Sequence, residues 1–211
     1  MPDDLPPDLQ PDVLLGAYAQ GVFPMDNEAG ELRWFRPHMR GLLPLDDRFH
    51  VGKNLRKRVR QQRFDVTTDR DFAAVMHACA DEREMWISDR MIAAYVRLHE
   101  FGFAHSVEVW QNGEVVGGLY GVAVGGAFCG ESMFTRATDA SKVALVYLVD
   151  TLRRQGFRLL DTQWVTDHLA QFGAYEVEAD RYEQLLADAL TIRPDWPQTL
   201  AYPDLSVPLS A

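Results

Sequence analysis

Cysteine is scarce in this 211-residue sequence, and long apolar runs are missing. The two cysteines, Cys79 and Cys129, are far apart in the chain, so they lack metal-ligand spacing and fit best as small buried side chains. No stretch reaches the roughly 18 to 20 apolar residues of a membrane span. The start of the chain also lacks a basic segment followed by an apolar one, which argues against secretion. We therefore expect a protein of the reducing cytoplasm with no membrane partner.

The sequence also has no excess of basic residues: 21 Lys and Arg against 31 Asp and Glu give a net charge of −10 at pH 7. That balance argues against indiscriminate nucleic-acid binding. One predicted helix, at about 51–62, is nevertheless rich in basic residues and has only Leu55 and Val59 as an apolar i, i+4 pair. Its charged face is either an ordinary solvated surface or a site that attracts a polyanion. The basic residues of this segment are Lys53, Arg56, Lys57, Arg58, Arg60 and Arg63.

Hydrophobic patterns predict an α/β fold with a mixed, mainly antiparallel sheet. Asn112-Gly113 and Gly125-Gly126 predict the two tight turns of a meander, the second through positive φ angles at both glycines. A helix at about 140–154 and a strand at 157–164 follow, and Pro44 predicts an edge strand at 40–47. This order resembles the acyltransferase fold of acetyl-CoA enzymes. The segment 135–142, however, has no glycine for a phosphate loop, so coenzyme A is not supported.

Glu131 is the one charged residue in the apolar stretch 117–134. A buried carboxylate is costly unless it is paired or hydrogen-bonded, so Glu131 needs a cation, a polar ligand group or neighbouring backbone N–H groups. A functional and a purely structural role both remain open. Asp161 and Gln163 are two residues apart on the predicted strand at 157–164, so they project from one face, where the amide can orient the carboxylate.

These motifs together resemble those of the leucyl/phenylalanyl-tRNA–protein transferases, from about Pro11 to about Tyr182. The matching segments are Gly21-Val22-Phe23-Pro24, Trp86-Ile87, 105–110, 116–122, 128–134 and 160–163. This chain departs from the family at Met25 and Phe35, where tryptophan is common, and at Thr162, which replaces a cysteine. The changes at Met25 and Phe35 lie in the region credited with stacking on the tRNA end.

The resemblance implies a small N-terminal domain at 1–37 and an acyltransferase-like (GNAT-type) domain at 38–211, acting as a monomer without metal or cofactor. It implies the transfer of leucine, phenylalanine and less often methionine from aminoacyl-tRNA to the N-terminal Arg or Lys of proteins. The products are marked for N-degron proteolysis.

The resemblance also implies roles for individual residues. Asp161 and Gln163 are the catalytic pair, Glu131 lies at the pocket for the aminoacyl-adenosine end, and Trp86 contributes to substrate binding. Apolar positions that match the donor pocket, each also consistent with ordinary core, are Leu119, Phe128, Met133, Leu145, Leu148 and Leu160. The expected tRNA contacts are Lys53, Arg56, Lys57, Arg60 and Arg63.

Two other classes of protein share part of these features. An acetyl-CoA-dependent acyltransferase would share the sheet, although the glycine loop is missing. A non-catalytic tRNA-binding adaptor would explain the basic helix, but it has no need of Glu131, Asp161 and Gln163 together.

Overall fold

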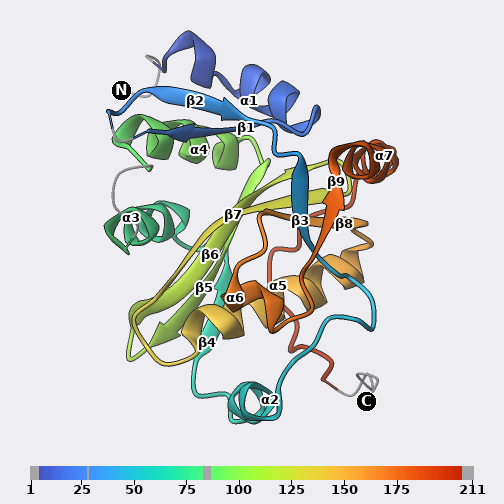
Figure 1. Ribbon diagram of the computed structural model, residues 1–211. Helices are drawn as coiled ribbons and strands as arrows, with labels where there is room; N and C mark the ends of the chain where they lie inside the picture. Colours follow the sequence, from blue (N-terminus) through green and yellow to red (C-terminus); the bar gives the residue numbers. More distant parts are fainter. Residues whose placement is uncertain (1–4, 28, 83–86, 206–211) are drawn as a thin grey trace.

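A seven-stranded mixed sheet forms the centre of the computed structural model, which describes residues 5–27, 29–82 and 87–205 (Figure 1). The strand order is β4-β5-β6-β7-β8-β3-β9, and every pairing is antiparallel except that of β7 with β8. The predicted mixed, mainly antiparallel sheet flanked by helices is confirmed. The strands are β3 (Met39–Leu43), β4 (Asp65–Thr68), β5 (Ala104–Gln111), β6 (Glu114–Val124), β7 (Ala127–Thr135), β8 (Leu159–Gln163) and β9 (Tyr175–Glu178).

The meander β5-β6-β7 follows the turns that the sequence predicts. Asn112 and Gly113 both have positive φ, at 54° and 83°, as a tight turn of this kind requires. In the second turn Gly125 has a φ of 57°, whereas Gly126 does not have a positive φ, so that part of the prediction is wrong. A Cβ on Gly126 would lie 2.5 Å from the side chain of Ile192, so close packing accounts for this glycine.

The helix α5 (Ala140–Gln155) carries the chain from β7 to β8, as a parallel pair requires. It covers one face of the sheet, while α3 (Phe72–Glu82) and α4 (Asp89–Glu100) cover the other (Figure 1). β7 pairs with β8 only from Ala127 to Cys129, although β7 continues to Thr135. The ladder between these two strands therefore ends after the first three of the nine residues of β7.

The two largest apolar cores lie on the two faces of the sheet, and a third, smaller one packs α7 (Ala179–Ala189) against β3, β7 and β8. Of the two largest, one joins α5 to side chains such as Val107 and Leu119, and the second joins α3 and α4 to Tyr120 and Val122. The N-terminal segment adds Leu14 to this second core. It comprises η1 (Pro7–Leu9), α1 (Pro11–Tyr18) and the two-stranded antiparallel sheet of β1 (Phe23–Asp26) and β2 (Leu32–Phe35).

The strand β3 is an interior strand between β8 and β9, so the prediction of an edge strand is wrong. That prediction depended on Pro44, but β3 ends at Leu43 and the proline takes no position in the ladder. The remaining helices are α2 (Lys53–Arg60), α6 (Asp167–Ala170) and α7 (Ala179–Ala189). Among the described residues, no helix is long and apolar enough to cross a membrane.

Candidate active site

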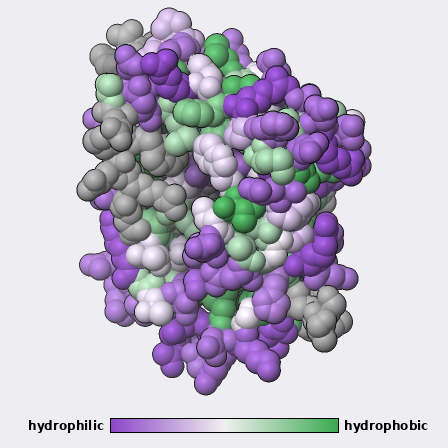
Figure 2. All heavy atoms as spheres, viewed as in Figure 1, coloured by the Kyte–Doolittle hydropathy of each residue, from purple (hydrophilic) through white to green (hydrophobic). Residues whose placement is uncertain are grey.

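A cavity of about 180 Å³ opens beside the point where the pairing of β7 with β8 ends. Most of its wall is apolar, with a small number of polar groups, which is the usual character of a binding site. Apolar side chains also reach the surface in the middle of the face shown in Figure 2. The cavity is lined by Phe23, Met25, Leu119, Tyr120, Gly130, Glu131, Ser132, Met133, Leu145, Leu148, Leu160, Thr162, Gln163, Trp164, Thr166, His168 and Leu169.

Most of the apolar residues predicted for the donor pocket line this cavity. These are Leu119, Met133, Leu145, Leu148 and Leu160. Phe128 does not line it, because its fully buried ring stacks on Trp196 with a centroid separation of 5.4 Å. Trp86 lies outside the described residues.

A β-bulge directs Glu131 into the site. Tyr120 pairs with Ser132 and Gly121 pairs with Gly130, so Glu131 is the extra residue on β7. Bulges of this kind bend a strand and re-aim a side chain. Glycine is required opposite the bulge, because a Cβ on Gly121 would lie 2.3 Å from the carbonyl oxygen of Cys129.

The carboxyl of Glu131 is held by neutral polar groups. Gln163 donates from Nε2 to Oε1 at 3.3 Å, and the Tyr95 hydroxyl donates to Oε2 at 3.5 Å. The hydroxyl of Tyr95 is also hydrogen-bonded to that of Tyr18. Burial raises the pKa of Glu131 to about 8, although hydrogen bonds from Tyr18 and Tyr95 partly oppose this shift. Glu131 can therefore exist in both protonation states near neutral pH.

Asp161 is held by a charged group instead of neutral ones, because the buried guanidinium of Arg40 pairs with its carboxylate. Arg40 donates from Nε and Nη2 to the two carboxylate oxygens at 2.9 and 2.5 Å, and both side chains are almost fully buried. The guanidinium lies between the rings of Phe23 and Tyr182, 4.7 and 4.5 Å from their centroids. Burial opposes the charge of Arg40, but the hydrogen bond and charge of Asp161 outweigh it, so the pKa of Arg40 lies above its ordinary value.

The backbone, not the side-chain amide, links Gln163 to Asp161. The Gln163 N–H donates to Asp161 at 2.9 Å, and the Tyr182 hydroxyl donates to the same carboxylate at 2.9 Å. Asp161 has no exposed surface and does not line the cavity. The expectation that the amide of Gln163 orients this carboxylate is therefore corrected: the amide hydrogen-bonds Glu131 instead.

Gln163 has a φ of 58°, a left-handed conformation that a residue with a side chain adopts at a cost. A tight turn follows, in which the Trp164 N–H donates to the Thr162 carbonyl at 2.6 Å. Gly41, which pairs with Gln163, makes room for this turn, because a Cβ there would lie 2.5 Å from the Trp164 carbonyl carbon. The conformation brings Gln163 to the cavity.

The basic residues of α2 lie apart from the cavity. Leu55 and Val59 are buried, as predicted, while Lys53, Lys57 and Arg60 are exposed. Arg56 is half-buried and donates to the Leu205 carbonyl at 3.4 Å. Arg63, also exposed, follows the end of the helix.

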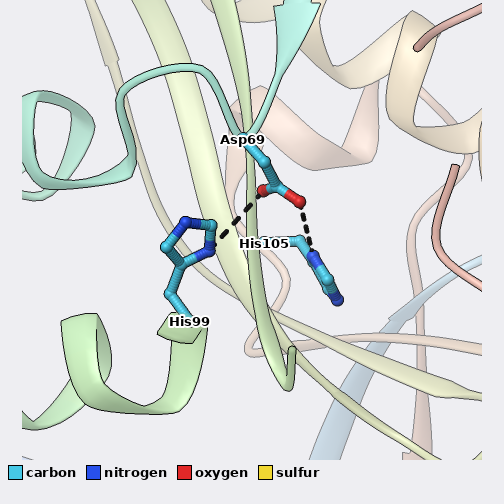
Figure 3. Close-up of side chains that lie close together, drawn as sticks. All are labelled: Asp69, His99 and His105. Atoms are coloured by element: carbon cyan, nitrogen blue, oxygen red, sulfur yellow. Dashed lines mark hydrogen bonds and ion pairs between the residues drawn. The ribbon is translucent and has the colours of Figure 1, made fainter. Parts of the chain in front are cut away.

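One further cluster, Asp69, His99 and His105, has the side-chain types of a metal site (Figure 3). The atoms that would bind a metal ion are already hydrogen-bonded within the protein. Asp69 lies between two imidazoles, 2.7 Å from Nδ1 of His105 and 3.8 Å from Nδ1 of His99. His99 Nδ1 is also 2.8 Å from the Ala104 carbonyl, which can only accept, so this nitrogen carries a proton. The cluster therefore fits a structural link between the ends of β4 and α4 and the start of β5.

Sequence reasoning missed three residues that hold the site together. Arg40, Tyr95 and Tyr182 lie in different elements from the carboxylates they contact, and Arg40 is 121 residues from Asp161. Arg40 is the second residue of β3, and the signal that could have found it is a charged side chain at the start of a strand that continues as Gly41-Leu42-Leu43.

Comparison with known proteins identifies the family. A model of the leucyl/phenylalanyl-tRNA protein transferase family matches residues 42–187, and a model of the N-terminal domain of that family matches residues 7–38. A leucyl/phenylalanyl-tRNA–protein transferase of Salinibacter ruber is 56% identical over 91% of this chain and 85% of its own length. The Paramagnetospirillum magneticum protein of the same name is 58% identical over 86% of this chain and 90% of its own length.

Among solved structures, a GCN5-related N-acetyltransferase-like protein from Streptococcus suis matches with a TM-score of 0.40 and 22% identity. That match covers 79% of this chain and 64% of the other chain. The family matches span nearly all of the sheet and the cavity. The chain belongs to the leucyl/phenylalanyl-tRNA–protein transferase family and is an aminoacyltransferase.

Proposed function

We propose that this protein transfers leucine or phenylalanine, and less often methionine, from aminoacyl-tRNA to the N-terminal Arg or Lys of acceptor proteins. Such products are substrates for N-degron proteolysis. The observation that carries the proposal is an apolar cavity with Glu131 and Gln163 in its lining. An apolar pocket discriminates a methylene by only about 1 to 3 kcal/mol, so several apolar amino acids would be accepted.

The proposed reaction is the aminolysis of an ester. The acceptor nitrogen forms an amide bond with the aminoacyl carbonyl carbon, the bond from that carbon to the ribose oxygen breaks, and the ribose oxygen gains a proton. An α-amine with a pKa of about 7.7 to 8.0 is partly neutral at pH 7, so it is already nucleophilic. Correct positioning of two reactants can lower the barrier by about 7 to 11 kcal/mol, which makes positioning the main task.

Within this scheme Gln163 is the catalytic residue of the predicted pair, and Asp161 is a positioning residue. Gln163 lines the cavity, whereas Asp161 acts through its hydrogen bond to the Gln163 N–H. Glu131 fixes the Gln163 amide and, once deprotonated, accepts the proton that the attacking amine loses and returns it to the ribose oxygen as that oxygen leaves. The ribose hydroxyl of the tRNA can itself relay this proton.

The exposed face of α2 is the proposed contact for the tRNA backbone. The exposed Lys53, Lys57 and Arg60 of the helix, the half-buried Arg56 and Arg63 just beyond the helix end would bind phosphates without regard to base sequence. Lys57→Glu with Arg60→Glu should weaken tRNA binding and lower the salt slope by about two, one for each phosphate contact. Arg181→Glu on α7 is the matched control, and an unchanged slope in the α2 variant refutes this assignment.

We also propose that the chain is organised as an N-terminal unit at 1–37 and a larger unit at 38–211, and that it acts as a cytoplasmic monomer. The separate family models for 7–38 and 42–187 support this division. Sedimentation of the full chain tests the oligomeric state.

Transfer of radiolabelled leucine from charged tRNA to two peptides that differ only in an N-terminal Arg or Ala tests the whole proposal. Label on the Arg peptide alone is the expected result. Label on neither peptide, while the protein still binds tRNA, would favour the adaptor function instead. Binding of coenzyme A would revive the acetyl-CoA alternative.

A further inference from the structure

Trp164 is a large aromatic residue that lines the cavity and is also exposed to solvent. It comes directly after Gln163, and 42% of its surface is exposed. The rings of Phe23 and Phe35 pack against its indole almost at right angles, with centroids 5.2 and 6.5 Å away. Two neighbouring rings therefore hold the indole in place, while part of it stays open to a ligand.

Two other aromatic rings at the surface are covered by an arginine of the same chain. The guanidinium of Arg70 lies 4.3 Å from the ring centroid of Trp110, and that of Arg97 lies 4.5 Å from Phe101. Within the described part of the chain, no arginine or lysine lies over Trp164. Tryptophan attracts a cation more strongly than any other aromatic side chain. The indole at the cavity can thus take a cation from another molecule.

Carboxylates lie on the same side of the sheet as the turn at Trp164. Gly41 pairs with Gln163 on one side and with Glu176 on the other, and a Cβ on Gly41 would meet the Trp164 backbone. Paired residues of neighbouring strands point to one face, so Glu176 leaves the sheet on the side where Trp164 lies. Glu176 and Asp167 are exposed, and neither makes an ion pair with a residue that the structure describes. This charge attracts a cationic ligand and repels the phosphates of tRNA.

We infer that Trp164 binds the basic side chain of the N-terminal Arg or Lys of the acceptor, with Glu176 and Asp167 supplying the negative charge around it. This inference rests on the proposed function and names the acceptor site within it. The α-amine of the acceptor has to reach Gln163 and Glu131, and its side chain starts from the next carbon atom. That side chain therefore lies close to the residue that follows Gln163.

The test measures the binding of acceptor peptides to the full chain saturated with a donor that cannot react, leucine joined by an amide bond to 3′-amino-3′-deoxyadenosine. One peptide begins with Arg and the other with citrulline, which has a similar shape but no charge. Calorimetry should show that the wild type prefers the Arg peptide by about tenfold or more, which corresponds to about 1.4 kcal/mol. Trp164→Leu should remove most of this preference by weakening the Arg peptide, while affinities for the citrulline peptide and the donor stay within about twofold.

Three further variants separate recognition from a merely structural role. Trp164→Phe keeps an aromatic face and should retain most of the preference. Glu176→Gln should weaken the Arg peptide by about threefold at low salt and less at high salt, because salt screens exposed charges. Tyr202→Leu is the matched control, since Tyr202 is 41% exposed, does not line the cavity and contacts Tyr147.

An unchanged preference in Trp164→Leu overturns the inference, and so does an equal loss for both peptides. Weaker donor binding with the preference intact also overturns it, because the indole would then stack on the terminal adenosine. The proposed function fails separately, if the wild type prefers the Arg peptide but transfers no leucine to it from charged tRNA.

Discussion

The regions around Asp161 and Glu131 each hold a carboxyl group inside the protein, but they neutralise it in different ways. Asp161 has a bidentate arginine, a tyrosine hydroxyl and a backbone N–H. Glu131 has the Gln163 amide at 3.3 Å and the hydroxyls of Tyr95 and Tyr18, and burial raises its pKa to about 8. The first carboxylate is held in a buried ion pair beneath the site, and the second, with its raised pKa, can change its protonation state. The surroundings of Asp161 suit the positioning of Gln163, and those of Glu131 suit the transfer of a proton.

The largest expected effect comes from removing the cation of the first region. Arg40→Met should reduce the free energy of unfolding by about 3 to 5 kcal/mol, because it leaves Asp161 charged and buried without its partner. Urea unfolding measures this change. Arg33→Met is the control, since its ion pair with Glu31 is exposed and should contribute less than about 1 kcal/mol. If Arg40→Met costs no more than the control, Asp161 is not a buried charge.

Asp161→Asn tests whether the ion-paired carboxylate serves the reaction. The variant keeps the size of the side chain but removes the charge that orders the Gln163 backbone, so turnover should fall by about 10²-fold or more. Affinity for tRNA should be retained, and Asp65→Asn on β4 should behave as the wild type. Equal losses of turnover and tRNA affinity would contradict the assigned role.

The pH dependence of stability in Glu131→Gln tests the raised pKa of Glu131. The folded-state pKa of about 8 lies above the ordinary 4.5, so between these values the folded protein binds a proton that the unfolded chain releases. Stability therefore falls as pH rises through this window. Between pH 5 and 8.5 the wild type should lose about 1 to 3 kcal/mol relative to Glu131→Gln. The exposed Glu114→Gln serves as the control, and identical pH profiles for all three proteins would rule out the raised pKa.

The smallest expected effects on stability come from Tyr182 and Tyr95, the tyrosines that contact the two carboxyl groups. Tyr182→Phe removes a 2.9 Å hydrogen bond to a charged group and should cost about 1.5 to 3 kcal/mol of stability. Tyr95→Phe removes a 3.5 Å contact with Glu131 and the hydrogen bond with the Tyr18 hydroxyl, each worth about 0.5 to 1.5 kcal/mol. Chemical denaturation at pH 7 measures both variants, and a cost below about 0.5 kcal/mol for Tyr182→Phe would contradict its hydrogen bond to a charged Asp161.

The sequence predicted the parts of this site that depend on local pattern. Asn112-Gly113 located the meander, and the residue alternation placed Glu131 among apolar neighbours. The bulge at Glu131 could not be predicted, because it depends on the register of β6 against β7. The same is true of Arg40, whose contact with Asp161 requires β3 to lie between β8 and β9. Five of the six apolar positions implied by the family resemblance line the cavity. Phe128 lies in the same core as Leu119, but its ring stacks on Trp196 instead of lining the cavity, a contact with a residue far along the chain that local pattern does not show.

The early end of the β7–β8 ladder has a consequence for how this cavity can change. Its width depends on main-chain pairing, which ends at Cys129, and not only on the size of the lining side chains. A substitution elsewhere that extended the pairing by two residues would narrow the opening while every lining residue stayed the same. The substrate range of such a protein could then drift through strand register, without any mutation in the pocket itself.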